Sequence, residues 1–529
     1  MKAGKELSNR IEDAVSVCFH AVPVNCLRMS LDTLSLSELI NQTFHFYSHN
    51  SSYATPGLYD VDIVDVSWIL ASTLIFFTMQ TGLALMEAGA CSPKNQVNVM
   101  MKHIVDICAG GTAFWMFGFA LMYGRGEYTN PFFGGGDFFT NATANDPLAG
   151  QILLFLFFQM SFATISTTIM SGAVAERFRF LPYILFSFSM SFVYAVGAGW
   201  VWGQHGWLKN IGVLDFAGTG PIHIIGGTAA FVAAWFIGPR LGRYDCGTEP
   251  LPRGSLLNVC LGLFILWWAW IGFNAGSSYG LTNGKWEMAA RAGAGTTLAT
   301  MAGGMTSILF SLAKHRGKID VYEIVLGILS ALVAINAGCN VFSMPSSFMT
   351  GVVAAILCLL TSPIVDKMHI DDAVGATAVH FVNGIWGEIS VGLFADPTSG
   401  LKGLFIDGNL YLLKVQAISA LSLTLWSAIM TLVIIWVVNK ILPIRMSEEE
   451  EIQGADLCEH YQSVHTGREL QRSMTTLEKI INVATPIANR FTSGPVETPN
   501  SRDSFVRRKP FTVVLNNYDN YGYNKNERV

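Results

Sequence analysis

The chain carries the stretch Asp215-Phe-Ala-Gly-Thr-Gly-Pro-Ile-His223-Ile-Ile-Gly-Gly227 and a later copy, Asp372-Ala-Val-Gly-Ala-Thr-Ala-Val-His380-Phe-Val-Asn-Gly384. Both copies read D-x-x-G-x-x-x-x-H-x-x-x-G, and both lie in strongly apolar surroundings. An ionisable side chain inside a membrane segment is costly, so it is a candidate functional residue by default. Two such residues at matching places in the two halves of a membrane protein predict one shared site at a repeat interface.

The composition is that of a membrane protein. The chain has 529 residues, of which 51% are hydrophobic and only 13% are charged. Soluble domains carry roughly 25% charged residues, so most of this chain is expected to lie in lipid. The net charge of −5 gives no sign of a nucleic-acid partner. The nine cysteines show neither a disulfide framework nor metal-ligand spacing; whether Cys18 and Cys26 pair is left open.

Eleven segments are long and apolar enough to be membrane helices, which need about 20 mainly apolar residues. We predict helices at 65–89, 97–123, 149–172, 180–202, 217–239, 255–279, 286–313, 320–337, 346–365, 373–395 and 407–441. The expected fold is an all-α polytopic membrane protein. It has two inverted five-helix repeats, because an odd number of spans reverses the second half, and a long eleventh helix.

The distribution of basic residues predicts the orientation. Loops that follow odd-numbered helices, with the helix ends beside them, carry thirteen Lys and Arg, against five on the other side. Basic residues favour the cytoplasm, so residues 1–62 are predicted to be an extracellular tail. Residues 63–441 then form the transmembrane domain and 442–529 a cytoplasmic tail, largely disordered after about 463. Three glycosylation sequons, at Asn41, Asn50 and Asn141, all fall on the side predicted to be external.

The repeated pattern predicts that the two histidines meet near the bilayer midplane. Eight residues separate Asp from His in each copy, and a helix rises about 1.5 Å per residue, so each His lies about 12 Å deep. One copy enters from outside and the other from inside a hydrocarbon core about 30 Å thick. Gly227 and Gly384 lie one turn beyond each His, where a missing side chain permits close helix approach. A purely structural His pair is the alternative.

The two aspartates have capping as their simplest role. Asp215 is predicted near the outer end of its helix, where Asp caps the backbone and favours the helix dipole. It could also supply a fixed negative charge that favours a cation entering below. Asp372, preceded by Asp371, is predicted to cap a helix at the cytoplasmic side.

Together with the repeated pattern, further motifs carry a resemblance to a known family. They are Gln80-Thr-Gly-Leu-Ala-Leu-Met-Glu-Ala-Gly89, Ser92-Pro-Lys-Asn95, Ala173-Val-Ala-Glu-Arg177, Asp215-Phe-Ala-Gly218, Trp270-Ile-Gly-Phe-Asn-Ala-Gly-Ser277 and His380-Phe-Val-Asn-Gly-Ile-Trp-Gly387. In this order, from about residue 60 to 461, the chain resembles the ammonium transporter (Amt/Mep/Rh) family, and within it the Amt branch of animals and other eukaryotes.

The resemblance implies a homotrimer, each subunit with its own narrow apolar pore, in a membrane that is expected to be the plasma membrane. It implies Phe162 and Phe273 as gate phenyls, with Phe162, Trp202 and Ser277 forming an outer ammonium site. It also implies His223 and His380 as the twin pore histidines. The tail segment Gly454-Ala-Asp-Leu-Cys-Glu-His-Tyr461 partly resembles the family's segment that contacts a neighbouring subunit; Tyr461 replaces a Gly, and Cys458 stands where some members have Thr.

The residue types fit ammonium chemistry. An aromatic box attracts a cation by about 2 kcal/mol when desolvated, and the hydroxyl of Ser277 can accept an N–H bond that potassium cannot offer. Beyond the gate, a bare cation is costly, whereas ammonium can lose a proton and continue as ammonia. Two histidines in contact resist double charging, offer lone pairs and can relay a proton.

Two other functions stay open: an ammonium sensor with little flux, and a neutral-gas channel for ammonia or carbon dioxide. The retained histidines and phenyls favour a conduit, and Trp202 and Ser277 favour a cation at its entrance. The expected partners are ammonium or ammonia, with methylammonium as a possible analogue, and the lipid bilayer. The sequence shows no nucleotide-binding loop, metal cluster or nucleophile–base pair, so we expect no enzyme activity, cofactor or metal.

Overall fold

The computed structural model describes residues 61–143, 148–246, 251–397 and 400–460. The chain divides into two units, Met1–Gln462 and Ser463–Val529, and the described residues all belong to the first. The predictions for Cys18, Cys26, Asn41, Asn50 and Tyr461 and for the distal tail fall outside the described residues. Asn141 is described and its side chain is exposed.

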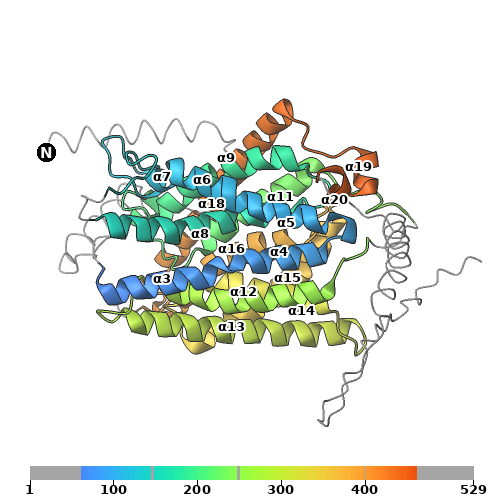
Figure 1. Ribbon diagram of the computed structural model, residues 1–529. Helices are drawn as coiled ribbons and strands as arrows, with labels where there is room; N and C mark the ends of the chain where they lie inside the picture. Colours follow the sequence, from blue (N-terminus) through green and yellow to red (C-terminus); the bar gives the residue numbers. More distant parts are fainter. Residues whose placement is uncertain (1–60, 144–147, 247–250, 398–399, 461–529) are drawn as a thin grey trace, which may run out of the picture. The chain divides into compact units, whose positions relative to one another are not determined.

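The eleven predicted helices are all present (Figure 1). The first consists of α3 (Ile63–Phe77) and α4 (Met79–Ala90). The second runs through η2 (Pro93–Asn95), α5 (Gln96–Val105), η3 (Asp106–Gly110), α6 (Gly111–Ala113), η4 (Phe114–Gly118) and α7 (Phe119–Tyr123). The rest are α8 (Ala149–Ala173), α9 (Phe180–Trp202), η5 (Thr219–Ile224) with α11 (Ile225–Ile237), α12 (Leu256–Gly276), α13 (Lys285–Lys314), α14 (Val321–Ile335), α15 (Met344–Lys367), η6 (Thr377–Val382) with α16 (Asn383–Phe394), and α18 (Tyr411–Ile441).

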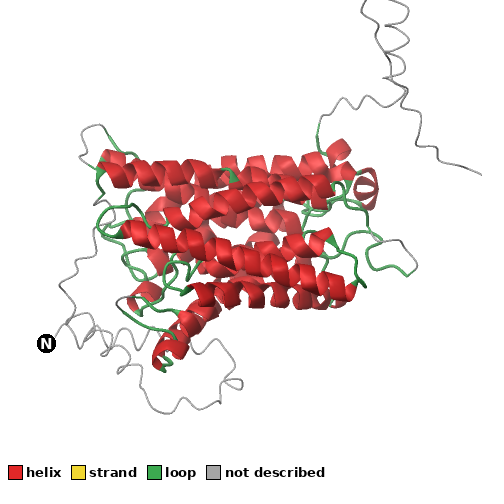
Figure 2. Ribbon diagram, turned by 90° about the horizontal axis from the view of Figure 1, so that it is seen from below, coloured by secondary structure: helices red, strands yellow, loops and turns green. Residues whose placement is uncertain are grey.

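Short helices lie outside these spans, namely α10 (Trp207–Asn210), α17 (Leu404–Asp407), α19 (Glu448–Gln453) and α20 (Ala455–Cys458). Figure 2 shows the long helices side by side, with the loops gathered at their two ends. Over the described ranges the chain forms helices and isolated bridges but no strand. The all-α fold predicted from the sequence is therefore confirmed.

Two of the eleven helices are less apolar or shorter than the others. Within the described residues, nine segments are long and apolar enough by themselves to cross a membrane, and α14 is a shorter apolar helix. The segment formed by η6 and α16 owes its lower hydropathy to five buried polar residues, namely Thr377, His380, Asn383, Glu388 and Ser390. Inner helices of a bundle face protein rather than lipid, so they tolerate polar groups that a lipid-facing helix would not.

The first helices of the two repeats, α4 and α12, pack closely through a pair of glycines. A Cβ added to Gly262 would lie 2.6 Å from the Gly82 carbonyl oxygen, and one added to Gly82 would lie 3.1 Å from the Gly262 carbonyl oxygen. Only glycine at both positions allows this approach, which is the usual small-residue packing of membrane helices. The contact joins the two halves of the bundle.

One end of the bundle, here called the Arg240 end, is held by a buried ion-pair cluster. Arg240 Nε lies 2.8 Å from Asp371 Oδ2, and the same guanidinium contacts Glu176. Burial would raise the pKa of the Asp371 carboxyl, but the hydrogen bonds and charge of Arg240 outweigh it and hold that pKa below its ordinary range. For Arg177 burial has the larger effect, because it disfavours the charged guanidinium and lowers its pKa to about 10.

The tail segment that resembles a family motif packs onto α5 of its own chain at the Arg240 end. The Asp456 carboxylate accepts hydrogen bonds from the Val97 and Asn98 backbone N–H groups, at 3.1 and 2.7 Å. The Glu459 carboxylate accepts one from the Phe180 N–H, at 2.9 Å. These carboxylates cap the first turns of α5 and α9, where negative charge complements the helix dipole.

Candidate functional site

The two histidines of the repeated pattern are in contact inside the bundle. His223 Nδ1 lies 3.0 Å from His380 Nδ1, and the rings are nearly parallel, with centroids 5.1 Å apart. Both are buried, at 0% and 5% exposure. At this distance one Nδ1 donates a proton and the other accepts it, so the pair holds one shared hydrogen bond. The contact predicted from the sequence is therefore present.

Both histidines stand on π-helical turns. His223 lies in η5 and His380 in η6. Pro221, two residues before His223, lacks the backbone N–H that a regular α-helical ladder would use. Single π turns are rare and occur mainly at functional sites, where they redirect side chains. The equivalent distortion in both repeats turns the two rings toward each other.

The glycines of the pattern bring the two histidine turns together reciprocally. A Cβ on Gly227 would lie 2.3 Å from the Phe381 nitrogen and 2.7 Å from the His380 carbonyl carbon. A Cβ on Gly384 would lie 3.1 Å from the Ile224 nitrogen and 3.4 Å from the His223 carbonyl carbon. Each glycine therefore lies against the backbone that carries the other repeat's histidine; the sequence predicted a close helix approach at both glycines but not this reciprocal contact.

The aspartates cap the same two turns. Asp215 accepts hydrogen bonds from the backbone N–H groups of residues 218, 219 and 220, at 2.7, 3.1 and 2.7 Å. Asp372 accepts them from residues 374, 375 and 377, at 3.3, 2.9 and 2.6 Å. Gly218 and Gly375 have φ values of +95° and +76°, which an L side chain rarely adopts. Each Asp, Gly and His that the two copies share thus has a structural role.

A line of aromatic rings leads to the histidines from the opposite end, here called the Trp202 end. The Trp202 and Phe162 centroids are 6.0 Å apart, and those of Phe162 and Phe273 are 4.6 Å apart. Trp270 follows, 5.9 Å from Phe273, and stacks on His223 at 5.3 Å with an interplanar angle of 13°. Four aromatic rings therefore lead from the Trp202 end to the histidine pair.

The polar atoms at the Trp202 end are oriented by the backbone. Ser277 Oγ donates a hydrogen bond to the Phe273 carbonyl at 2.9 Å, which leaves its oxygen lone pairs able to accept another. Trp202 Nε1 donates to the Asp215 carbonyl at 2.8 Å, so its ring is fixed beside Phe162. Trp200, two residues earlier, instead packs against Trp207 and Trp426.

Sequence reasoning missed several residues of this arrangement. Phe76 lies 5.0 Å from Phe162 and 5.8 Å from Phe273, and it is fully buried. Trp270 belongs to one of the motifs, but the motif gives no indication that its ring stacks on His223. Its position three residues before Phe273, on the same helix face, is the signal that could have revealed it. Phe76 carries no comparable signal, because aromatic residues are abundant in this chain.

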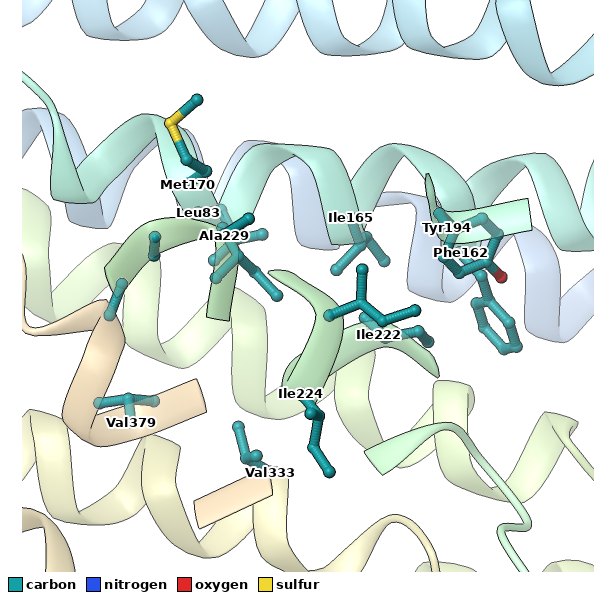
Figure 3. Close-up of a cluster of buried hydrophobic side chains, with 14 of the residues drawn as sticks. Leu83, Phe162, Ile165, Met170, Tyr194, Ile222, Ile224, Ala229, Val333 and Val379 are labelled. Carbon is teal, nitrogen blue, oxygen red and sulfur yellow. The ribbon is translucent and has the colours of Figure 1, made fainter. Parts of the chain in front are cut away.

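The surroundings of the histidines are apolar. Figure 3 shows Ile165 of α8, Ile222 and Ile224 of η5, Val333 of α14 and Val379 of η6 gathered around the two turns. Toward the Arg240 end a cavity of about 550 Å³ opens, and its lining joins Thr377 and Ala378 to charged side chains such as Arg240, Asp366 and Asp372. An unpaired ion is costly among the apolar side chains beside the histidines, whereas a small neutral molecule is not.

One cluster of possible metal ligands occurs in the described part of the chain, and it lies outside this arrangement. His315, Asp320 and Glu323 place ligand atoms within 4.8 Å of one another. Glu323 already pairs with Lys314 and with His315, the latter at 3.1 Å. Asp320 caps α14 by accepting hydrogen bonds from the N–H groups of Tyr322 and Glu323. The cluster has a sufficient structural role.

The comparisons with known proteins identify the class. Residues 67–465 match the model of the Ammonium Transporter Family. The chain is 36% identical over 433 residues to "Putative ammonium transporter 3" of Caenorhabditis elegans, covering 79% of this chain and 62% of that one. It is 36% identical over 404 residues to "Putative ammonium transporter sll1017" of Synechocystis sp., covering 75% and 88%. The solved structure "Sensor Amt Protein" superposes with a TM-score of 0.69 at 30% identity, covering 75% and 98%.

A bundle of eleven membrane helices in two inverted repeats, with its polar groups at the repeat interface, defines a multi-pass transport protein. The chain belongs to the Ammonium Transporter Family. The family is one of transporters rather than enzymes. The chain spans less than two thirds of the length of the nematode relative, so that protein's other properties are not carried over.

Proposed function

We propose that this chain moves ammonium across the membrane by binding the cation at the Trp202 end and passing it, as ammonia, along the histidine pair. The observation that supports this most is the unbroken line of rings from Trp202 to His380. It gives a cation an attractive entrance and then an apolar interior with basic nitrogens. The family membership supports the same substrate.

Recruitment depends on the atoms at the entrance. The faces of Trp202 and Phe162 attract a cation, and desolvation strengthens this attraction to about 2 kcal/mol or more. The Ser277 oxygen can accept one N–H bond, because its own proton is directed to the Phe273 carbonyl. Potassium has similar size and charge but no hydrogen to donate. The Asp215 carboxylate nearby adds a favourable negative potential.

Passage depends on loss of a proton. Phe162 and Phe273 block the way for a hydrated ion, because their centroids are only 4.6 Å apart. A desolvated cation beyond them would find mainly apolar side chains around the two imidazoles, whereas ammonia crosses at much lower cost. The imidazole nitrogens of His223 and His380 can accept the released proton or hydrogen-bond the neutral molecule. Two adjacent imidazoles do not both become charged, so one proton is held at a time.

We further propose the orientation and assembly expected from the sequence. The Trp202 end faces the outside and the Arg240 end faces the cytoplasm of a plasma membrane, and three copies form a homotrimer with one pore each. The distribution of Lys and Arg supports this orientation. Residues 1–62, 63–441 and 442–529 are then the external tail, the transport domain and the cytoplasmic tail.

Radiolabelled methylammonium uptake and ammonium-evoked current in expressing cells test the proposal. The wild-type protein is expected to take up methylammonium and to exclude potassium. Trp202→Leu combined with Ser277→Ala should weaken apparent affinity about tenfold or more, because it removes a cation–π contact and a hydrogen bond. Unchanged affinity and discrimination at equal surface expression would reassign both residues to packing.

A sensor with little flux is the second candidate, because one superposable structure is named as a sensor. It predicts saturable ammonium binding without uptake. Uptake by the wild-type protein would contradict it. Ammonia flux that does not depend on Trp202 or Ser277 would favour a neutral-gas channel instead.

A further inference from the structure

A second buried carboxyl group, Glu388 of α16, lies beside Asp215. Glu388 is 0% exposed and Asp215 is 7% exposed. A Cβ added to Gly220 would lie 2.5 Å from Glu388 Oε1 and 3.3 Å from Asp215 Oδ2, so both oxygens crowd the same point. The two carboxyl groups are close enough to act directly on each other. The transport steps above make no use of Glu388.

The inverted repeat explains why these two residues meet. Asp215 stands eight residues before His223, and Glu388 stands eight residues after His380. The two segments run in opposite directions through the membrane, and the histidines lie at the same depth. Counting eight residues back from His223 and eight residues forward from His380 therefore leads to the same side of the membrane, about 12 Å from the histidines. Glu388 therefore lies at the Trp202 end, although its own repeat has its Asp at the other end.

One carboxyl oxygen of the pair, Oε1 of Glu388, accepts no hydrogen bond. Asp215 already accepts three backbone N–H groups. Glu388 Oε2 accepts from Gln416 Nε2 at 2.7 Å. Glu388 Oε1 is buried and makes no hydrogen bond to a donor of the described residues, although the Ser419 hydroxyl, also buried and without a partner, lies near this carboxyl group. Two adjacent buried carboxylates cannot both stay ionised at tolerable cost. A proton on Oε1 would remove one charge and convert the unpaired oxygen into a donor to Asp215.

The other groups that face the pair leave the proton with Glu388. Tyr194 and Cys339 are the further ionisable side chains on which the Asp215 charge acts, and neither is charged near pH 7. Gln416 and Ser419 of α18 are the polar side chains that approach Glu388. Asp215 has the three backbone donors at a helix start, so it is the better site for the negative charge.

We propose that Glu388 is the protonated partner of Asp215, a neutral acid that donates a hydrogen bond to the Asp215 carboxylate and so positions the outer cation site. Glu388 is linked to that site through the backbone at Leu214 and Asp215. The Asp215 carbonyl accepts the Trp202 Nε1–H at 2.8 Å. Gln416, which binds Glu388, also donates to the Leu214 carbonyl at 2.8 Å. Glu388 therefore fixes the backbone that holds Trp202; it is a positioning residue and does not touch the substrate.

Transport measurements on two variants test this assignment, which rests on the proposed function. Glu388→Gln keeps the shape and both hydrogen bonds, because its amide N–H can donate to Asp215 and its oxygen can accept from Gln416. It should retain the apparent methylammonium affinity within about twofold. Glu388→Leu removes the donor and should weaken the affinity about tenfold, equivalent to about 1.4 kcal/mol. Ser390→Ala is the matched control, because Ser390 is buried in the same helix and bonds only to the Gly387 carbonyl.

Infrared spectroscopy of the purified protein gives a readout independent of transport. Wild type and Ser390→Ala should show the carbonyl stretch of a protonated carboxylic acid that Glu388→Gln lacks. Identical spectra in that region would overturn the proposal. So would a Glu388→Gln variant as impaired as Glu388→Leu, or a Glu388→Leu variant with wild-type affinity. If the wild-type protein takes up no methylammonium, the transport proposal fails, and the infrared comparison alone decides the protonation of Glu388.

Discussion

Replacing Gly227 by Ala should separate the two histidines. The added Cβ would lie 2.3 Å from the Phe381 nitrogen, whereas ordinary van der Waals contact begins at 3.4 Å. The backbone of η6 must therefore retreat by about 1.1 Å, the difference between these two values. The Nδ1···Nδ1 distance of 3.0 Å would grow to about 4 Å, beyond hydrogen-bond range. Misplacing reacting groups by about 1 Å can cost about 100-fold in rate.

Methylammonium uptake normalised to surface expression is the assay. Gly227→Ala should reduce the rate by one to two orders of magnitude and destabilise the protein by about 1–3 kcal/mol, as overpacking does. Gly384→Ala should be milder, because its nearest backbone atom is the Ile224 nitrogen at 3.1 Å. Gly150→Ala is the control, since nothing lies within 4 Å of its added Cβ. A Gly227→Ala protein with the wild-type rate would refute the view that this glycine sets the histidine separation.

Three further predictions concern other parts of the protein. The double change His223→Ala and His380→Ala should lower the ratio of ammonium-evoked current to uptake or admit potassium; currents of wild-type size and selectivity would exclude a proton relay. Asp371→Asn should lower the stability in detergent by up to about 3–5 kcal/mol, because it removes one of the two buried carboxylates that pair with Arg240. The pKa of Asp371 is below its ordinary value, so this difference should be complete at neutral pH and shrink as the pH falls below about 4. Asn141→Gln should reduce a glycan-dependent gel shift by one glycan if its loop is external; a shift of unchanged size would assign the glycans to the other sequons, Asn41 and Asn50.

The number and order of membrane helices could be predicted from hydropathy, because lipid contact demands long apolar segments. Local departures from regular helices could not be predicted in this way. The first helix changes at Thr78, where α3 ends and α4 begins, and the second contains the π turns η3 and η4. These departures depend on how each helix packs against its neighbours, and the mean hydropathy of one segment contains no information about its neighbours. Packing against neighbouring helices also sets the ends of each helix, and most observed ends lie within a few residues of the predicted ones.

The pairing of the histidines could be predicted because the repeated pattern fixes depth by counting along a helix. Glu388 could not be recognised in the same way. It belongs to no repeated motif, and its partner Asp215 comes from the other half of the chain. The same holds for Trp270, whose stacking on His223 depends on the rotation of α12 about its own axis.

The sequence alone determined the depth of each polar residue in the membrane and the glycines that let helices approach. These properties follow from rise per residue, hydropathy and the absence of a side chain, and each can be read along one segment. Only the tertiary structure decided which side chains face each other across helices: the ring line from Trp202 to His380, and the meeting of Glu388 with Asp215. The rotation and crossing of helices result from close packing of all neighbours at once, so no single segment specifies them.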